Sequence, residues 1–151
     1  MASFSVRAAG LLDLPDVVRL AKNAALETGG WFGWTSDEAA ALAFVGLITG
    51  ARAGWVLVAV NPSDETLGGV LITSTQPGSA MGEYLYVAPD ARERWNGTLA
   101  ALVRAHRKLM KLAGIAEEVV LAAPSRAAYW EQHGYDLKSV LLSRTMEGKG
   151  A

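Results

Sequence analysis

The stretch RWNGTLAAL, residues 94–102, decides which fold is expected for this chain. In it Gly97 follows an arginine by three positions and precedes small and apolar residues that favour a helix. Backbone N–H groups at the start of a helix attract anions, and a glycine lets the chain approach a ligand closely. The stretch therefore predicts a turn into a helix that can hold phosphate groups. A glycine that only shapes the turn explains so short a pattern equally well.

The segments beside this turn predict a strand before it and a long helix after it. Residues 82–87 are an apolar and aromatic run typical of a strand. From Leu99 onward, side chains of the apolar stripe recur at steps of three and four, at Leu102, Val103, His106, Leu109, Met110 and Ala113. This spacing predicts one amphipathic helix. His106 is expected to be a hydrogen-bonded residue at the edge of the core rather than a catalyst.

The N-terminal part predicts a strand, two helices and a hairpin. Residues 4–8 alternate as a half-buried strand does, and Asp13 is expected to cap the helix that follows. Thr35 with Glu38 has the pattern of a capping box, which opens a second helix that Gly50 ends. Two strand-like runs separated by turn residues then predict an antiparallel hairpin, over residues 55–60 and 67–73.

The C-terminal part is expected to add a strand, a short helix and a last strand. Residues 119–121 are wholly apolar, as in a central strand covered on both faces. A helix is expected from residue 124 to His133, and a final strand over residues 135–146. The predicted order is β-α-α-β-β-β-α-β-α-β, an α/β fold with a mixed sheet. We expect one domain, residues 1–147, and a flexible tail, residues 148–151.

The composition excludes several kinds of function. The 151 residues carry a formal net charge of −1 and include no cysteine and two histidines. Balanced charge argues against nucleic-acid and membrane partners, and the ligands of thiolate or histidine metal centres are missing. No apolar run approaches the ~20 residues of a membrane-spanning helix, and the N-terminus lacks a signal-peptide pattern. We expect a cytoplasmic protein that holds no metal.

The turn and its surroundings resemble the GNAT superfamily of acetyl-CoA-dependent N-acetyltransferases over nearly the whole chain. The family's pattern of Gln or Arg, two residues, Gly, one residue and then Gly or Ala falls on Arg94, Gly97 and Leu99. Leu99 departs from it, and its side chain either crowds the phosphates or turns into the core. Two further segments are similar to family motifs, namely YVAP at residues 86–89, which ends the fourth strand, and YWEQHGY at residues 129–135.

The resemblance implies acetyl-CoA as the cofactor and an amine as the acceptor, either a small molecule or a peptide. The residues assigned to the cofactor lie at the end of the fourth strand and in the turn, and they are Tyr86, Val87, Arg92, Arg94, Asn96, Gly97 and Thr98. The acetyl group is expected to pass directly to the amine, in agreement with the absence of cysteine. The sequence does not name the acceptor, and it leaves a homodimer open.

Amine acetylation needs a general base for the amine, and a general acid can protonate the departing thiolate. Glu83 is the expected base, because family members with a glutamate base carry it on the fourth strand at similar spacing; a solvated strand residue is the alternative. Trp130 stands where the family has a tyrosine acid, and an indole N–H is no usable acid. Tyr129 is the adjacent candidate, although one helical step turns it ~100° away. Three other tyrosines remain, Tyr84, Tyr86 and Tyr135.

The aromatic loop WFGW, residues 31–34, stands where the resembled family borders its acceptor site. Its rings either shape an apolar pocket for the acceptor or pack the corner between two helices. Leu99 and Trp130, the two departures from the family motifs, favour a different function. In that alternative the chain is a catalytically silent module with the GNAT fold and a structural or regulatory role in a larger assembly.

Overall fold

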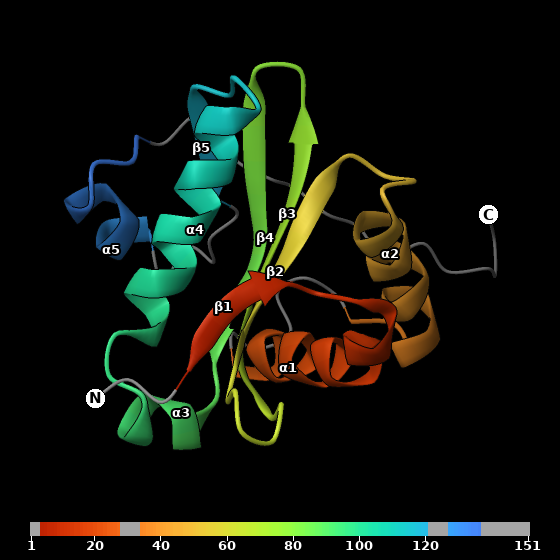
Figure 1. Cartoon of the computed structure of the whole chain (residues 1–151). Helices are drawn as coiled ribbons and strands as arrows, with labels where there is room; N and C mark the ends of the chain where they lie inside the picture. Colours follow the sequence, from red (N-terminus) through yellow and green to blue (C-terminus); the bar gives the residue numbers. More distant parts are fainter. Residues whose placement is uncertain (1–3, 28–33, 121–126, 137–151) are drawn as a thin grey trace, which may run out of the picture. The chain divides into compact units, whose positions relative to one another are not determined.

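The computed structural model describes residues 4–27, 34–120 and 127–136, and the chain divides into two compact units, Met1–Leu121 and Ala122–Ala151. A mixed sheet forms the centre of the first unit (Figure 1). Its described strands follow one another in chain order: β1 (Ser5–Ala8), β2 (Gly54–Val60), β3 (Leu67–Gln76), β4 (Ser79–Val87) and β5 (Glu117–Val120). Neighbouring strands are antiparallel from β1 to β4, whereas β5 is parallel to β4.

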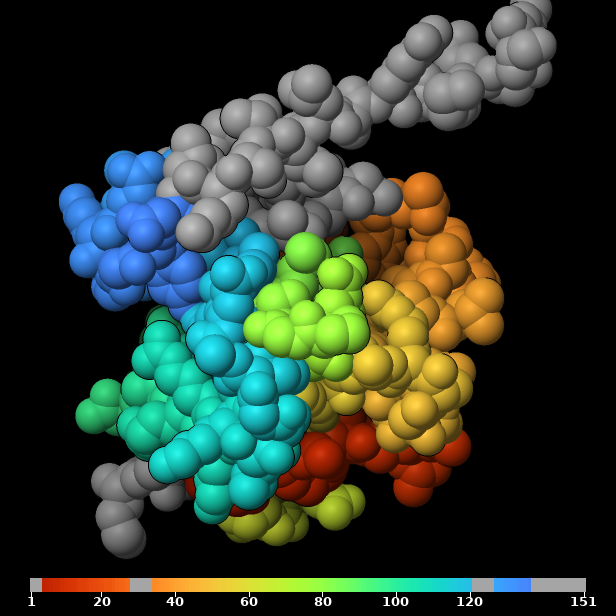
Figure 2. Space-filling model, turned by 90° about the horizontal axis from the view of Figure 1, so that it is seen from above, coloured from red at the N-terminus to blue at the C-terminus, as the bar shows by residue number. Residues whose placement is uncertain are grey.

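Helices cover both faces of this sheet. The described helices of the first unit are the 3-10 helix η1 (Leu11–Asp13), α1 (Leu14–Glu27), α2 (Asp37–Thr49), α3 (Pro89–Arg94) and α4 (Thr98–Leu112). Helices α1 and α2 pack on one face, and α3 and α4 on the other. Seen from above in Figure 2, the tip of the β3–β4 hairpin lies between the α4–β5 turn and the segment that follows α2. No helix in the described part of the chain is long and apolar enough to cross a membrane.

The central strands bury side chains on both faces, which explains their nearly continuous apolar sequences. On β2, Val56 and Val58 pack under α1 and α2, while Leu57 and Ala59 pack under α3 and α4. The core therefore consists of two layers separated by the sheet. The active-site candidates described below lie at the edge of the layer under α2.

Two consecutive glycines in β3 let the α3–α4 turn approach the sheet closely. A Cβ atom on Gly68 would lie 2.1 Å from the ring of Trp95, and one on Gly69 would lie 3.1 Å from Leu102. Trp95 is buried and also stacks on Phe4, with 5.9 Å between ring centroids. Because Gly68 and Gly69 have no side chains, Trp95 and the start of α4 can pack directly against β3.

The predicted order of elements is confirmed over the described residues, with corrections at the helix starts. Asp13 does not cap α1: its carboxylate accepts from the Gly10 N–H at 2.7 Å and from Arg7 at 2.6 Å, and so holds the turn of η1. Helix α2 is capped by Ser36 rather than Thr35, because the Ser36 hydroxyl accepts from the Ala39 N–H at 3.0 Å. Gly50 ends α2 in the left-handed conformation, as predicted.

The strands also differ from their predicted limits. The hairpin is confirmed, but β3 runs to Gln76 and β4 begins at Ser79, because the pairing between the two strands continues as far as Gln76 and Ser79. Short helix α3 was not predicted. Among the described residues β5 lies at the edge of the sheet, with Glu117 exposed, and the strand predicted over residues 135–146 lies almost wholly outside the described residues.

Candidate active site

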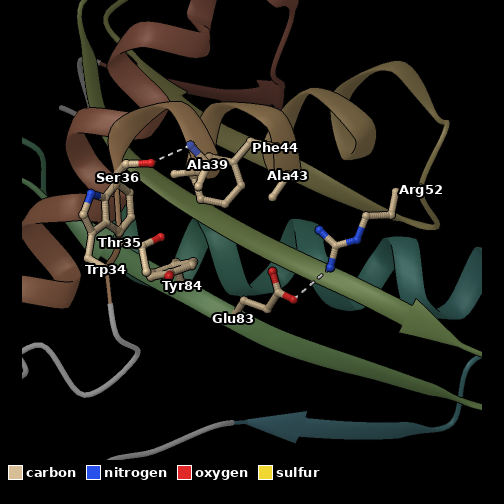
Figure 3. Close-up of a pocket in the computed structure, with 10 residues that line it drawn as sticks. Trp34, Thr35, Ser36, Ala39, Ala43, Phe44, Arg52, Glu83 and Tyr84 are labelled. Atoms are coloured by element: carbon tan, nitrogen blue, oxygen red, sulfur yellow. Dashed lines mark hydrogen bonds and ion pairs between the residues drawn. The ribbon is translucent and has the colours of Figure 1, made fainter. Parts of the chain in front are cut away.

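Glu83 is the extra residue of a β-bulge in β4. Ile72 of β3 pairs with Tyr84 and the next residue, Thr73, pairs with Gly82, so Glu83 has no counterpart. A bulge changes the side to which the following side chains point. Regular alternation would place Glu83 and Tyr84 on opposite faces, but both line one pocket on the α2 side (Figure 3).

This pocket has a volume of about 300 Å³ and an aromatic wall. The Tyr84 ring meets Trp34 and Phe44 edge to face, with centroids 6.3 Å and 5.8 Å away. Small side chains of α2 leave space above these rings (Figure 3). The lining residues are Trp34, Thr35, Ser36, Ala39, Ala40, Ala43, Phe44, Arg52, Glu83 and Tyr84. Trp34 thus lines a pocket, which is one of the two alternatives for the aromatic loop, while residues 31–33 lie outside the described part of the chain.

An ion pair closes the other end of the pocket. Arg52 Nη2 donates to Glu83 Oε1 at 3.2 Å, and the two side chains are 43% and 22% exposed. Asp37, just beyond the lining residues, accepts from the Trp34 indole N–H at 3.0 Å and lies 3.2 Å from Lys22 Nζ. The Trp34 hydrogen bond and then Lys22 hold the pKa of Asp37 below its ordinary value. Both carboxylates near the pocket are therefore matched by a cation.

Tyr84 is the tyrosine that the described structure places beside Glu83. Burial, and then the charge of Glu83, raise the pKa of Tyr84 above its ordinary value. A tyrosine phenol is protonated at neutral pH, so Tyr84 carries a proton beside Glu83, although its raised pKa makes it a weaker acid than an ordinary tyrosine. The sequence had left Tyr84 as one of three alternatives to Tyr129.

Next to the bulge, one side of β4 has no partner strand among the described residues. β5 pairs with residues 79–82 of β4, and no described residue of β5 pairs with the part from Glu83 to Val87. The far end of this part lies close to the start of α4: Val87 pairs with Gly69, and a Cβ on Gly69 would meet the Thr98 methyl group at 3.4 Å. Backbone groups of β4 and of the helix start can therefore face one ligand.

The start of α4 offers backbone amides rather than side chains. Gly97 is the N-cap residue, with φ of 83°, no capping side chain and nothing within 4 Å of an added Cβ. The Thr98 hydroxyl is buried and donates to the Trp95 carbonyl at 3.0 Å. Leu99 is 45% exposed, which excludes one of its two alternatives, the turn into the core: on α4 the inward stripe begins with Thr98 and Leu102. The amides of the first turn suit an anion.

The other residues assigned to the cofactor are in different surroundings. The Tyr86 hydroxyl donates to Glu27 Oε1 at 3.0 Å, and Arg92 donates to Glu27 Oε2 at 3.2 Å. Arg92 also lies 5.2 Å from the centre of the Tyr86 ring. Burial and the Glu27 hydrogen bond raise the pKa of Tyr86. The Val87 side chain is buried in the core, which leaves its backbone for a ligand, while Arg94 and Asn96 are exposed.

Tyr129 and Trp130 belong to the second unit, on helix α5 (Ala127–Gln132). The Tyr129 ring contacts Trp130 at 5.4 Å and His133 at 4.5 Å between centroids. His133 Nδ1 donates to the Tyr129 carbonyl at 2.8 Å, so His133 caps the end of its helix. Within this unit Trp130 also packs edge to face on Tyr135.

Sequence reasoning missed Arg52, which lies between α2 and β2. The segment ARAG, residues 51–54, contains no motif, and the charge partner of Arg52 comes from a strand 31 residues further along the chain. The bulge at Glu83 was also missed, because a register shift between two strands leaves no pattern in either sequence. In the sequence of β4, Gly82 is the one residue that indicates an irregular strand, because a glycine inside a strand often marks a bulge.

No protein-family model and no curated protein matches the sequence. Solved structures do match in three dimensions. The aminoglycoside N-acetyltransferase AAC(6')-Iy in complex with CoA has a TM-score of 0.71 and 16% identity, over 96% of this chain and 96% of that chain. An aminoglycoside acetyltransferase from an uncultured soil metagenomic sample, in complex with sisomicin, has a TM-score of 0.68 and 16% identity, over 96% and 97%.

A third match is a predicted acetyltransferase with acetyl-CoA from Clostridium acetobutylicum, with a TM-score of 0.71 and 13% identity, over 94% of this chain and 96% of that chain. The three alignments run over nearly the full length of both partners, so they compare whole folds rather than a shared motif. The chain has the α/β fold of the GNAT-type acetyltransferases, as its resemblance to that superfamily implies.

Proposed function

We propose that this protein is an N-acetyltransferase that transfers the acetyl group of acetyl-CoA directly to a small amine. The observation that carries the proposal is the bulge at Glu83, which points a carboxylate into a pocket beside the open edge of β4. Fold alone does not settle function, so the proposal depends on this geometry. The CoA and acetyl-CoA held by two proteins of the same fold are consistent with it.

The residues present fit coenzyme A. The first turn of α4 has no side-chain cap, and the space around the Cβ position of Gly97 is open, so its amides have room for a pyrophosphate. Arg94 and Asn96 are exposed beside this turn, and the backbone of Tyr86 and Val87 lines the open edge of β4. Thr98 contributes its amide, since its hydroxyl already has a partner. Bound there, the cofactor supplies an activated acetyl thioester.

The chain's own residues then have distinct tasks. Glu83 accepts a proton from the acceptor's ammonium group, so that a neutral amine can attack the acetyl carbon. A C–N bond forms, the C–S bond breaks, and the thiolate leaves as coenzyme A after taking a proton. Tyr84 lines the described pocket and is the first candidate for the source of that proton, and Tyr129 remains the second candidate. A coenzyme A thiol resembles a cysteine thiol, so the thiolate also leaves tolerably without help.

Two measurements test this function. Mass spectrometry of the purified protein and calorimetry with acetyl-CoA ask whether the cofactor binds. Release of free thiol from acetyl-CoA, measured with a panel of amines, asks whether the acetyl group is transferred. Cofactor binding with amine-dependent thiol release supports the proposal. Absence of binding at millimolar acetyl-CoA contradicts it.

Trp130 favours the second candidate, a catalytically silent module, because it stands where the resembled family has its tyrosine acid. If the protein is an enzyme that only lacks this acid, Trp130→Tyr raises turnover by about 10-fold, less than the full effect of a general acid. If Tyr84 already donates the proton, the same substitution leaves turnover unchanged or lowers it, and Tyr84→Phe lowers it. If both wild type and variant bind acetyl-CoA but release no thiol with any amine or peptide, the silent module is correct.

A further inference from the structure

We propose that the acceptor is a free α-amino acid with an aromatic or branched apolar side chain, bound as a zwitterion in the pocket between α2 and β4. The inference rests on the proposed function, because it names the acceptor of the same site. Its basis is that one end of the pocket presents a cation and an anion together and the other end presents aromatic rings (Figure 3).

The ion pair fits the two charged groups of an amino acid. Arg52 and Glu83 come from different elements and share one N–O contact of 3.2 Å. A guanidinium offers several N–H donors, so Arg52 can take a carboxylate on the donors that Glu83 does not use. Glu83 then faces the ammonium group that it must deprotonate. A simple amine would contact Glu83 alone and leave the remaining donors of Arg52 unused.

The opposite end of the pocket suits an apolar side chain of moderate size. Trp34, Phe44 and Tyr84 supply aromatic surface, and the alanines of α2 leave the space open. The volume of about 300 Å³ is at the lower end of the range of about 300–1,000 Å³ for small-molecule sites. The pocket therefore holds one small ligand rather than a chain of residues.

Charge argues against a polyamine such as an aminoglycoside. Several ammonium groups need several carboxylates without other partners, since an unpaired buried charge is costly. Among the described lining residues Glu83 is the only carboxylate, and Arg52 pairs with it. Asp37 nearby is held by Trp34 and Lys22. A zwitterion adds no net charge and agrees with this balance.

The transfer to this acceptor is balanced without another reactant. The α-ammonium group gives one proton to Glu83 and another to solvent or to the leaving thiolate. The α-nitrogen forms a bond to the acetyl carbon as the C–S bond breaks. The products are an N-acetyl amino acid, which has lost its positive charge, and coenzyme A. Because Glu83 no longer faces a cation, the product is held less tightly than the substrate.

The test compares ligands that differ only in the carboxylate. Thiol release from acetyl-CoA is measured with L-phenylalanine against phenethylamine, L-leucine against isoamylamine, and sisomicin. We expect kcat/KM for each amino acid to exceed that of its amine by at least about 10-fold, and sisomicin to be the poorest. If the amines are acetylated as well as the amino acids or better, the inference is wrong while the proposed function stands. If nothing is acetylated, the proposed function fails.

Arg52→Gln tests the carboxylate contact directly. In this variant the ratio of kcat/KM for L-phenylalanine to that for phenethylamine falls by at least about 10-fold. Arg107→Gln is the matched control, because it breaks an ion pair with Glu118 of 3.5 Å on the outer face of α4. The control keeps the wild-type ratio. An unchanged ratio in Arg52→Gln, with the melting temperature preserved, overturns the assignment.

A binding measurement keeps the inference testable without turnover. Calorimetry with L-phenylalanine alone shows heat of binding for wild type and at least about 10-fold weaker binding for Arg52→Gln. Ala43→Leu fills part of the pocket from α2 and also weakens binding, while cofactor binding remains. Equal affinity in wild type and both variants means that the amino acid binds elsewhere, and the inference is then wrong.

Discussion

At Glu83, one extra residue in a strand turns a carboxylate toward the pocket. Without the bulge, Glu83 would face the α4 side, where Leu85 and Val87 pack. With it, Glu83 joins Tyr84 on the side of α2. Because the side-chain period of a strand is two, a single insertion is enough to change the chemistry that one face presents.

Glu83→Gln is expected to lower kcat by about 10²–10⁴ while the affinity for acetyl-CoA stays nearly constant, since the amide cannot accept a proton from the ammonium group. Rates of the amine reaction are measured between neutral and high pH. Wild type and variant should converge at high pH, where the amine is already neutral. Glu38→Gln, at the start of α2, controls for loss of a carboxylate. Parallel rate profiles across the pH range would show that Glu83 is not the base.

His106 is buried and hydrogen-bonded, as predicted from its place on the apolar stripe. The Trp55 indole donates to His106 Nδ1 at 3.1 Å, so the imidazole carries its proton on Nε2, which lies 3.4 Å from Glu118 Oε2. The hydrogen bond from His106 to Glu118 is the main cause that holds the pKa of Glu118 below its ordinary value. The cluster joins β2, α4 and β5.

Glu118 is therefore expected to stabilise the fold in a pH-dependent way. A carboxyl group with a lowered pKa stabilises the folded state above its unfolded pKa, and this contribution is lost as the pH falls through the folded pKa. The free energy of unfolding is compared between wild type and Glu118→Gln by urea denaturation. The difference should be largest near neutral pH and shrink at acidic pH. Glu117→Gln, exposed on the same strand, should show no such trend; a constant difference for Glu118→Gln would contradict the assignment.

At the scale of elements, the site depends on how closely α4 approaches β3. Trp95 lies over Gly68, and Thr98 lies near Gly69, so the helix start follows the two glycines. The turn that the sequence marks at Gly97 is thereby held next to the end of β4. Strand β3, which carries none of the proposed site residues, thus positions the helix that we propose binds the cofactor.

Gly68→Ala should destabilise the protein by about 1–3 kcal/mol, because its Cβ would lie 2.1 Å from the Trp95 ring and force it to move. Gly82→Ala is the matched control on the next strand, where the added Cβ meets Val120 at an ordinary 3.6 Å. Urea denaturation of both variants measures the difference. Equal stability of the two variants would mean that Trp95 does not pack on β3 in this way.

At the scale of the whole molecule, acetyl-CoA is expected to raise the melting temperature, because it binds the native state and not the unfolded chain. A cofactor at 100 times its Kd contributes about 2.7 kcal/mol. Gly97→Glu should abolish this shift, since a carboxylate would occupy the anion site. Thermal denaturation with and without acetyl-CoA measures it.

Gly114→Glu controls for backbone strain in that experiment. Gly114 has φ of 70° and open space around its Cβ position, as Gly97 does, but it follows the other end of α4. Both variants should lose stability, and only Gly97→Glu should lose the response to acetyl-CoA. A full response in Gly97→Glu would remove the turn from the cofactor site.

The sequence by itself determined the described elements and their order, apart from the short helices η1 and α3. Local signals are sufficient for this: apolar periodicity in α4, the left-handed glycines at the ends of helices, and the strand-like runs of β2 and β3. It also named Gly97, which stands in a motif of a resembled family, and Glu83, whose strand and spacing match those of the glutamate base in that family. Thr35 and Ser36 are both good helix-capping residues, and the sequence favoured Thr35 although Ser36 caps α2.

Only the tertiary structure decided which side chains meet. The register of β3 against β4 created the bulge, the loop after α2 brought Arg52 to Glu83, and packing on β3 left Leu99 outside the core. These outcomes depend on contacts between segments far apart in the chain. No single segment encodes them, since a side chain's partner is fixed by the sum of packing energies over both elements and not by its own neighbours in sequence.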